Sequence, residues 1–111
     1  MGNLFSKITY KKFENNILEF RHSYLVEFEG EYYHLYLCET ELILAKKKQI
    51  IKSFLYKDIY SWKSFSNIWS FITSNNKVYT VKTLYNLEIS KNIFDITTNL
   101  SKRMKNGEIL I

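Results

Sequence analysis

The stretch LEISKNIFDITTNLSKRM, residues 87–104, decides the fold class because its apolar residues repeat with the period of an α-helix. These residues recur at intervals of four, three, four and four, which places them on one side of a helix. Asn86 is a suitable N-cap residue, and Asn106-Gly107 is a suitable stop. We therefore predict a C-terminal amphipathic helix, with a buried stripe formed by Ile89, Ile93, Ile96, Leu100 and Met104.

The residues that precede this stretch show the period of two that is typical of β-strands. Residues 32–38 are the clearest case, because Tyr33, Leu35 and Leu37 fall on one face and the residues between them on the other. The acidic residues 29–31 before them predict a turn. Seven strands are predicted, at residues 17–28, 32–38, 42–45, 50–56, 59–64, 68–73 and 78–83.

These elements predict a mainly β (α+β) fold, in which a seven-stranded antiparallel barrel or sandwich is capped by one C-terminal amphipathic α-helix. The chain has 111 residues, of which 46% are apolar and 17% aromatic, so it suits one folded domain and is too apolar for disorder. We assign residues 1–15 to a basic N-terminal arm that is either a short amphipathic helix or a flexible segment. Residues 16–106 then form the domain and residues 107–111 a tail.

The later part of the chain resembles a pleckstrin-homology-like domain. Residues 57–62, KDIYSW, resemble the start of its fourth or fifth strand, residues 68–83 the hairpin that follows, and residues 87–100 its capping helix. The resemblance covers residues 17–105 as a pattern. It implies two nearly orthogonal sheets closed at one corner by the helix.

The charge of one turn separates this chain from the phosphoinositide-binding members of that family. Those members place Lys and Arg across the first two strands, whereas residues 27–31, EFEGE, are acidic here. Like charge repels phosphate, so specific binding of inositol lipids at this turn is not expected. Arg21 and Arg103 are the two arginines, and nothing in the sequence predicts that they converge as a phosphotyrosine site requires.

The first residues carry the clearest functional motif. The sequence MGNLFS, residues 1–6, fits the N-myristoylation pattern M-G-x-x-x-[ST], with Gly2 as the acceptor after removal of Met1. Ser6 and Lys7 are favourable at their positions, and no acidic residue intrudes. The alternative is a chance match, because both required residues are common. Acylation would place the protein in the cytoplasm, associated with the cytoplasmic leaflet of a membrane.

A myristoylation motif directly before a lone pleckstrin-homology-like domain is similar to the inner membrane complex sub-compartment proteins of apicomplexan parasites. The richness of the chain in Lys, Asn, Ile and Tyr also suits an AT-rich genome. Those proteins typically carry N-terminal cysteines for palmitoylation, and the N-terminal arm of this chain contains none.

A second membrane contact is expected, because one myristoyl chain holds a protein only weakly. Lysines near Gly2 and in the turn at residues 46–48 are candidates for contact with an anionic membrane surface. The turn is alternatively a solvated loop or a nucleic-acid patch. Nucleic acid is the unlikely partner, because the aromatic residues do not interleave with basic residues as in an RNA-binding sheet. The candidate lysines are Lys7, Lys11, Lys12, Lys46, Lys47, Lys48 and Lys52.

Three aromatic residues are candidates for a surface that binds a protein partner. Trp62 and Trp69 belong to predicted strands, where core packing is the commoner role. Phe94 lies off the predicted buried stripe, so it is either the exposed edge of a peptide groove or the margin of the core. The sequence does not identify the partner, and it leaves a homo-oligomer open.

No residue pattern predicts catalysis, a metal site or a cofactor. His34 and Cys38 share one face of a predicted strand and His22 lies on the neighbouring segment, but isolated residues of these types are more often packed than metal-bound. Three glycines do not form a phosphate-binding loop. The single cysteine excludes an internal disulfide and suits a reducing compartment.

The sequence therefore predicts a non-catalytic adaptor or scaffold, held at a cytoplasmic membrane face by N-myristoylation and binding a protein partner. No apolar run approaches the ~20 residues of a membrane-spanning helix, so attachment is expected rather than insertion. The alternative is a soluble peptide-binding module of a larger complex, without lipidation. A phosphoinositide-binding or RNA-binding domain is a weaker alternative.

Overall fold

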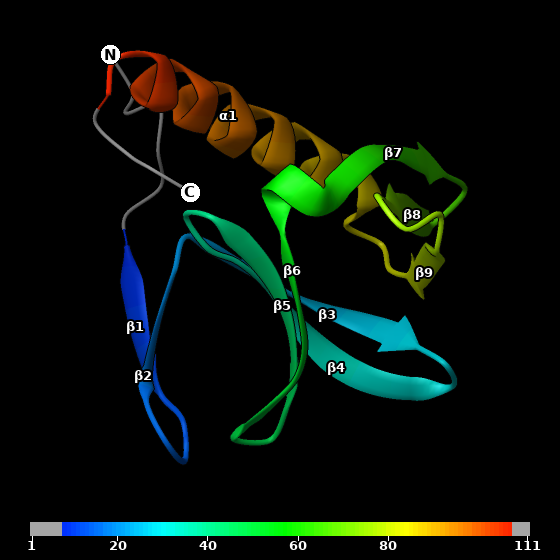
Figure 1. The fold of residues 1–111 in the computed structure, drawn as a ribbon. Coiled ribbons are helices and arrows are strands. Elements are labelled where there is room, and N and C mark those ends of the chain that lie inside the picture. Colours follow the sequence, from blue (N-terminus) through cyan, green and yellow to red (C-terminus); the bar gives the residue numbers. More distant parts are fainter. Residues whose placement is uncertain (1–7, 108–111) are drawn as a thin grey trace.

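The computed structural model describes residues 8–107, and Figure 1 shows their fold. The described chain forms nine β-strands, a short 3₁₀ turn (η1, Tyr56–Asp58) and one α-helix. The strands are β1 (Thr9–Lys12), β2 (Ile17–Phe20), β3 (His22–Phe28), β4 (Glu31–Leu37), β5 (Glu41–Lys46), β6 (Gln49–Leu55), β7 (Ile59–Phe65), β8 (Ile68–Thr73) and β9 (Val78–Lys82). The helix is α1 (Asn86–Lys105).

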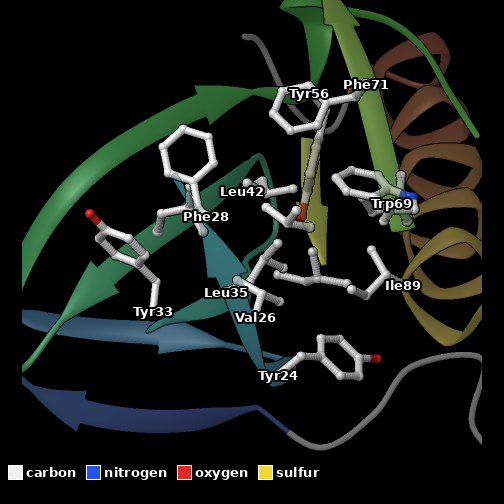
Figure 2. Close-up of a cluster of buried hydrophobic side chains, with 14 of the residues drawn as sticks. Tyr24, Val26, Phe28, Tyr33, Leu35, Leu42, Tyr56, Trp69, Phe71 and Ile89 are labelled. Atoms are coloured by element: carbon white, nitrogen blue, oxygen red, sulfur yellow. The ribbon is translucent and has the colours of Figure 1, made fainter. Parts of the chain in front are cut away.

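Seven of these strands form one antiparallel sheet in the order β6-β5-β4-β3-β9-β8-β7. Two meanders, β3 to β6 and β7 to β9, meet where β3 pairs with β9 through the single pair Glu27↔Lys82. The sheet bends so that both meanders and α1 surround a common core, part of which Figure 2 shows. The predicted mainly β fold, with a seven-stranded antiparallel sandwich and a C-terminal helix, is confirmed.

The helix α1 buries four of the five residues predicted for its apolar stripe. Ile89 and Ile93 are 0% exposed, and Ile96 and Leu100 are nearly as buried. Met104 is 41% exposed, so its predicted burial is wrong. Each step of four residues turns the side chain by about 40° beyond a full turn, and two such steps carry Met104 away from the core.

The two ends of α1 differ in how well the sequence predicts them. At the end, Gly107 adopts a φ of +75° and donates its N–H to the Met104 carbonyl at 3.0 Å, which confirms the predicted stop. At the start, Tyr85 occupies the N-cap position, and the predicted N-cap Asn86 is a buried residue of the first turn. Its side-chain amide donates to the Ile68 carbonyl at 3.2 Å, so Asn86 ties the helix to β8.

The N-terminal hairpin β1–β2 covers part of the second face of the sheet. Phe13 and Leu18 pack there with a second group of buried residues, Tyr36, Cys38, Ile43 and Ala45. Residues 9–12 are therefore a strand, whereas the sequence predicts a helix or a flexible segment. Arg21 separates β2 from β3, so the predicted strand at residues 17–28 belongs to two different sheets.

The turn between β3 and β4 has the geometry that its residues favour. Glu29 and Gly30 have φ values of 52° and 80°, as a two-residue hairpin with both central residues at positive φ requires. The predicted acidic turn is thus confirmed, and Gly30 adopts the left-handed conformation without strain.

Candidate functional site

The residues of the lipidation motif, Gly2, Ser6 and Lys7, lie outside the described residues. The structure does show where the chain that follows them enters the fold. Thr9 pairs with Phe20 in the β1–β2 register, and Phe20 is the residue directly before Arg21. The segment that begins at Gly2 therefore joins the domain beside Arg21.

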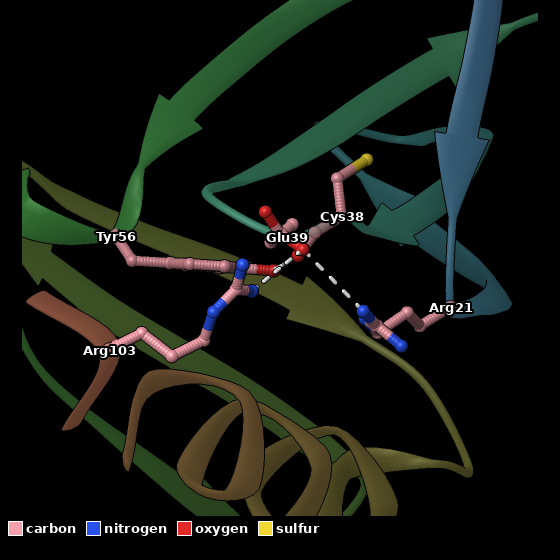
Figure 3. A network of polar contacts seen from close by, with 5 residues as sticks. All are labelled: Arg21, Cys38, Glu39, Tyr56 and Arg103. Atoms are coloured by element: carbon pink, nitrogen blue, oxygen red, sulfur yellow. Dashed lines mark hydrogen bonds and ion pairs between the residues drawn. The ribbon is translucent and has the colours of Figure 1, made fainter. Parts of the chain in front are cut away.

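Arg21 belongs to a charged cluster at the C-terminal end of α1 (Figure 3). The Glu39 carboxylate lies 3.5 Å from Arg21 and 3.1 Å from Arg103. The two arginines thus converge, which the sequence did not predict, and they converge on a carboxylate. Glu39 in this way connects the helix, the turn between β4 and β5, and the start of β3.

A buried hydrogen bond stabilises the turn between β4 and β5. The Tyr56 hydroxyl donates to the Cys38 carbonyl at 2.8 Å, and burial holds the pKa of Tyr56 well above its ordinary value. Burial, together with the Glu41 and Glu19 carboxylates, raises the pKa of the Cys38 thiol to about 12. Cys38 is therefore a packed side chain whose thiol is protonated at neutral pH.

The predicted basic residues divide into engaged and exposed lysines. Lys11 donates to the Tyr36 hydroxyl at 3.0 Å, so its ammonium group lies against the sheet. Lys46 pairs with Glu31 and lies 5.7 Å from the centre of the Tyr33 ring, and its hydrogen bond to Glu31 raises the pKa of Lys46.

Lys12, Lys47, Lys48 and Lys52 are exposed. The turn between β1 and β2 meets the turn between β5 and β6, because Glu14 donates its N–H to the Lys48 carbonyl at 3.2 Å. We call Lys12, Lys47 and Lys48 the basic end. The structure thus brings the turns that carry these predicted lysines together, and the Glu14 carboxylate there accepts a hydrogen bond from Gln49.

The outer face of α1 carries a second group of lysines that the sequence analysis missed. Lys91, Lys102 and Lys105 are exposed on the helix, together with Leu87 (73% exposed) and Phe94 (61% exposed). We call these five residues the outer face. The exposure of Phe94 follows its place off the buried stripe, and the same helical period applied to Lys91, Lys102 and Lys105 would have found the other members.

The two candidate tryptophans lie in different environments. Trp69 is 0% exposed, and its indole N–H donates to the Ser90 hydroxyl of α1 at 3.0 Å (Figure 2 shows its place in the core). Trp69 is therefore core, the commoner role that the sequence predicts, and the alternative of an exposed partner surface is wrong for this residue. Trp62 is half-buried and packs against the same core from β7.

The strand β7 forms one edge of the seven-stranded sheet. Tyr60 and Phe65 on this strand are 76% and 72% exposed. An edge strand presents unpaired backbone N–H and C=O groups, to which an extended peptide can add as a further strand. Trp62 and Phe94 thus lie on elements that contact each other, β7 and α1.

A groove of about 490 Å³ lies where the two meanders join. Leu25, Tyr32 and Leu84 contribute exposed apolar side chains to it, and Thr83 donates to the Leu25 carbonyl at its base at 3.3 Å. The sequence analysis did not identify this groove, because its residues come from segments far apart in the chain.

The histidines and the cysteine do not converge. His22 contacts Asn92 of α1, whereas Cys38 lies in the cluster on the other face of the sheet and His34 is exposed. Burial, followed by the nearby Arg21 charge, lowers the pKa of His22. Among residues 8–107, no three or more His, Cys, Asp or Glu residues group closely enough to hold a metal ion.

Comparison with known proteins gives no family. No protein-family model matches the chain, and no curated protein matches it in sequence. The one helix of the described residues, α1, is not apolar enough to cross a membrane.

Proposed function

We propose that this protein is a non-catalytic adaptor held at the cytoplasmic face of a membrane by myristoylation of Gly2. The observation that carries the proposal is the sequence MGNLFS at residues 1–6, followed at Thr9 by a strand of a folded domain. An acyl chain on Gly2 would therefore sit within a few residues of the folded surface. Such an anchor sets the location of the domain, and the domain selects its partner.

The proposal includes a pleckstrin-homology-like domain that does not use the inositol-lipid site of that family. One sheet of seven antiparallel strands with a C-terminal helix supports the resemblance. At the turn between β3 and β4, Glu31 holds the lysine nearest to it, Lys46, in an ion pair. Little positive charge is then left for a phosphate group. The resemblance to apicomplexan inner membrane complex sub-compartment proteins stays a prediction.

Metabolic labelling with an alkyne myristate tests the anchor. The native chain should take up the label, and Gly2→Ala should abolish it, because acylation needs an N-terminal glycine amine. The matched control is Ser101→Ala, on the exposed side of α1, which should label as the native chain does. Absence of label on the native chain, or label that survives Gly2→Ala, contradicts the proposal.

A second candidate function is a soluble peptide-binding module, and the exposed edge of β7 favours it. A partner strand that adds to this edge would lie beside Tyr60 and Phe65, which are largely exposed. A photo-crosslinking residue placed at Tyr60 should capture the partner in cells, whereas the same residue at the exposed Tyr32, outside β7, should not. Equal capture at both positions would contradict partner binding at β7.

A further inference from the structure

One face of α1 combines exposed apolar and positively charged side chains. Leu87 and Phe94 project from this outer face with Lys91, Lys102 and Lys105. The two acidic residues of the helix flank this face on the side of Lys91: Glu88 lines the same pocket as Lys91, and Asp95 follows Lys91 by one helical turn.

Within residues 8–107, none of the three outer-face lysines forms an ion pair, in contrast to Lys46 with Glu31. The charge of the outer face is thus available to an anionic surface. Exposed apolar side chains beside lysines are the combination that lets a helix lie in the headgroup region of a membrane.

The chain that carries the acyl group enters the fold at the C-terminal end of this helix. Thr9 lies opposite Phe20, the next residue Arg21 pairs with Glu39, and Glu39 pairs with Arg103 of α1. The start of β1 and the red end of α1 accordingly lie on one side of the molecule in Figure 1. The six residues from Gly2 to Lys7 span about 20 Å at most, so the anchor holds this end near the membrane.

The basic end and Glu39 lie at opposite ends of β5. Glu39 precedes β5 and Lys47 follows it, and six strand residues span about 20 Å. Charges farther from an anionic surface than a Debye length of about 10 Å are largely screened. When α1 lies along the membrane, the turn between β5 and β6 that carries Lys47 and Lys48 lies at the far end of β5 from the helix (Figure 1), too far away to contribute.

We propose that the outer face of α1 is the surface of this domain that lies against an anionic lipid membrane. The inference rests on the proposed function, because the acylated Gly2 supplies the first attachment. It assigns the second attachment to Leu87, Lys91, Phe94, Lys102 and Lys105. The edge of β7 then stays accessible to a protein partner while the domain is bound.

Sedimentation of the acylated full-length chain with vesicles tests the proposal. The vesicles contain phosphatidylcholine with phosphatidylserine, or phosphatidylcholine alone. Replacing Lys91, Lys102 and Lys105 by Gln should weaken binding to the anionic vesicles on the order of 100-fold, because each lysine near such a surface contributes about fivefold. The matched variant replaces Lys12, Lys47 and Lys48 by Gln, removes the same charge, and should change binding by less than about threefold.

A fluorescent probe gives a second readout that does not depend on charge. The probe is attached to a cysteine introduced by Phe94→Cys or by Lys47→Cys, since Cys38 is buried and its thiol pKa is raised to about 12. On the anionic vesicles, the probe at position 94 should shift to the blue and the probe at position 47 should not.

The possible results separate this inference from the proposed function. Binding of the acylated chain that is lost with the Lys12, Lys47 and Lys48 replacements, or a blue shift confined to position 47, overturns the outer-face assignment and leaves the anchor standing. A silent probe at position 94 on bound protein, which a protein-binding role of Phe94 would give, overturns it as well. An acylated chain that binds neither vesicle overturns both proposals.

Discussion

On its inner face α1 presents Ile89, Ile93, Ile96 and Leu100 to the core, and on its outer face it presents Leu87, Phe94 and three lysines to solvent. Both faces follow the same helical period, yet only the inner face is apolar throughout. The comparison teaches that one helix can determine the fold through one side and present a binding surface through the other. Changes on the inner face should alter stability, and changes on the outer face should alter binding.

The largest difference between the faces should appear in two neighbouring residues. Ile93→Ala should lower the free energy of unfolding by about 2–5 kcal/mol, because it leaves a cavity in a fully buried site. Phe94→Ala removes a larger side chain, but it should change the free energy of unfolding by less than about 0.5 kcal/mol because Phe94 is exposed. Urea unfolding followed by circular dichroism measures both. A similar loss in the two variants would show that Phe94 is packed.

A smaller effect is expected at the polar boundary between the faces. Ser90→Ala removes the acceptor of the buried Trp69 N–H and should lower the free energy of unfolding by about 1–3 kcal/mol. Ser101→Ala, on the exposed side, is the matched control and should stay within about 0.5 kcal/mol of the native chain. Equal effects of the two substitutions would rule out the Trp69 contact as a source of stability.

The charged cluster at the C-terminal end of α1 should contribute less to the free energy of unfolding than the Trp69–Ser90 hydrogen bond does. Glu39→Gln weakens the pairing with Arg21 and Arg103 and should lower the free energy of unfolding by about 0.5–1 kcal/mol, since the carboxylate is partly exposed. The difference should shrink in high salt. Glu29→Gln, in an exposed turn, serves as the control. A loss that does not respond to salt would point to packing rather than charge.

The smallest expected effect is on the pH dependence of stability, and it comes from His22 of β3, which contacts Asn92 of α1. Burial lowers the pKa of folded His22 below 6.5, so the unfolded chain takes up a proton more readily. Folding stability is therefore lost as the pH falls below about 6.5. His22→Gln should flatten this part of the profile, whereas His34→Gln should keep it. Thermal unfolding across this pH range compares the two, and unchanged profiles for both would contradict a role for His22.

The sequence predicts the fold well where the spacing of the apolar residues alone determines which side chains are buried. The alternation in residues 32–38 and the spacing from Ile89 to Leu100 both place the buried side chains correctly. The prediction fails where burial depends on a distant segment. Tyr36 lies on the face opposite to Tyr33, Leu35 and Leu37, and it is buried because the β1–β2 hairpin packs over it.

The candidate site was less predictable, because charge along a sequence does not reveal which charges are compensated. Lys46 is the first residue of the densest lysine cluster, yet Glu31 on the neighbouring strand pairs with it. Lys91 is far in the sequence from Lys102 and Lys105, and it shares a face with them only after the helix forms. Arg21 and Arg103 likewise converge on Glu39 only in three dimensions.

The two edges of the seven-stranded sheet have a consequence for the protein in a crowded cell. Lys52 lies at the centre of β6 and Lys63 near the centre of β7, and both are exposed. Two copies that met edge to edge would place like charges side by side, which opposes runaway strand pairing and fibril growth. Lys52 and Lys63 would therefore oppose pairing between two copies of this chain, whereas a partner strand with carboxylates at the matching positions would not be repelled.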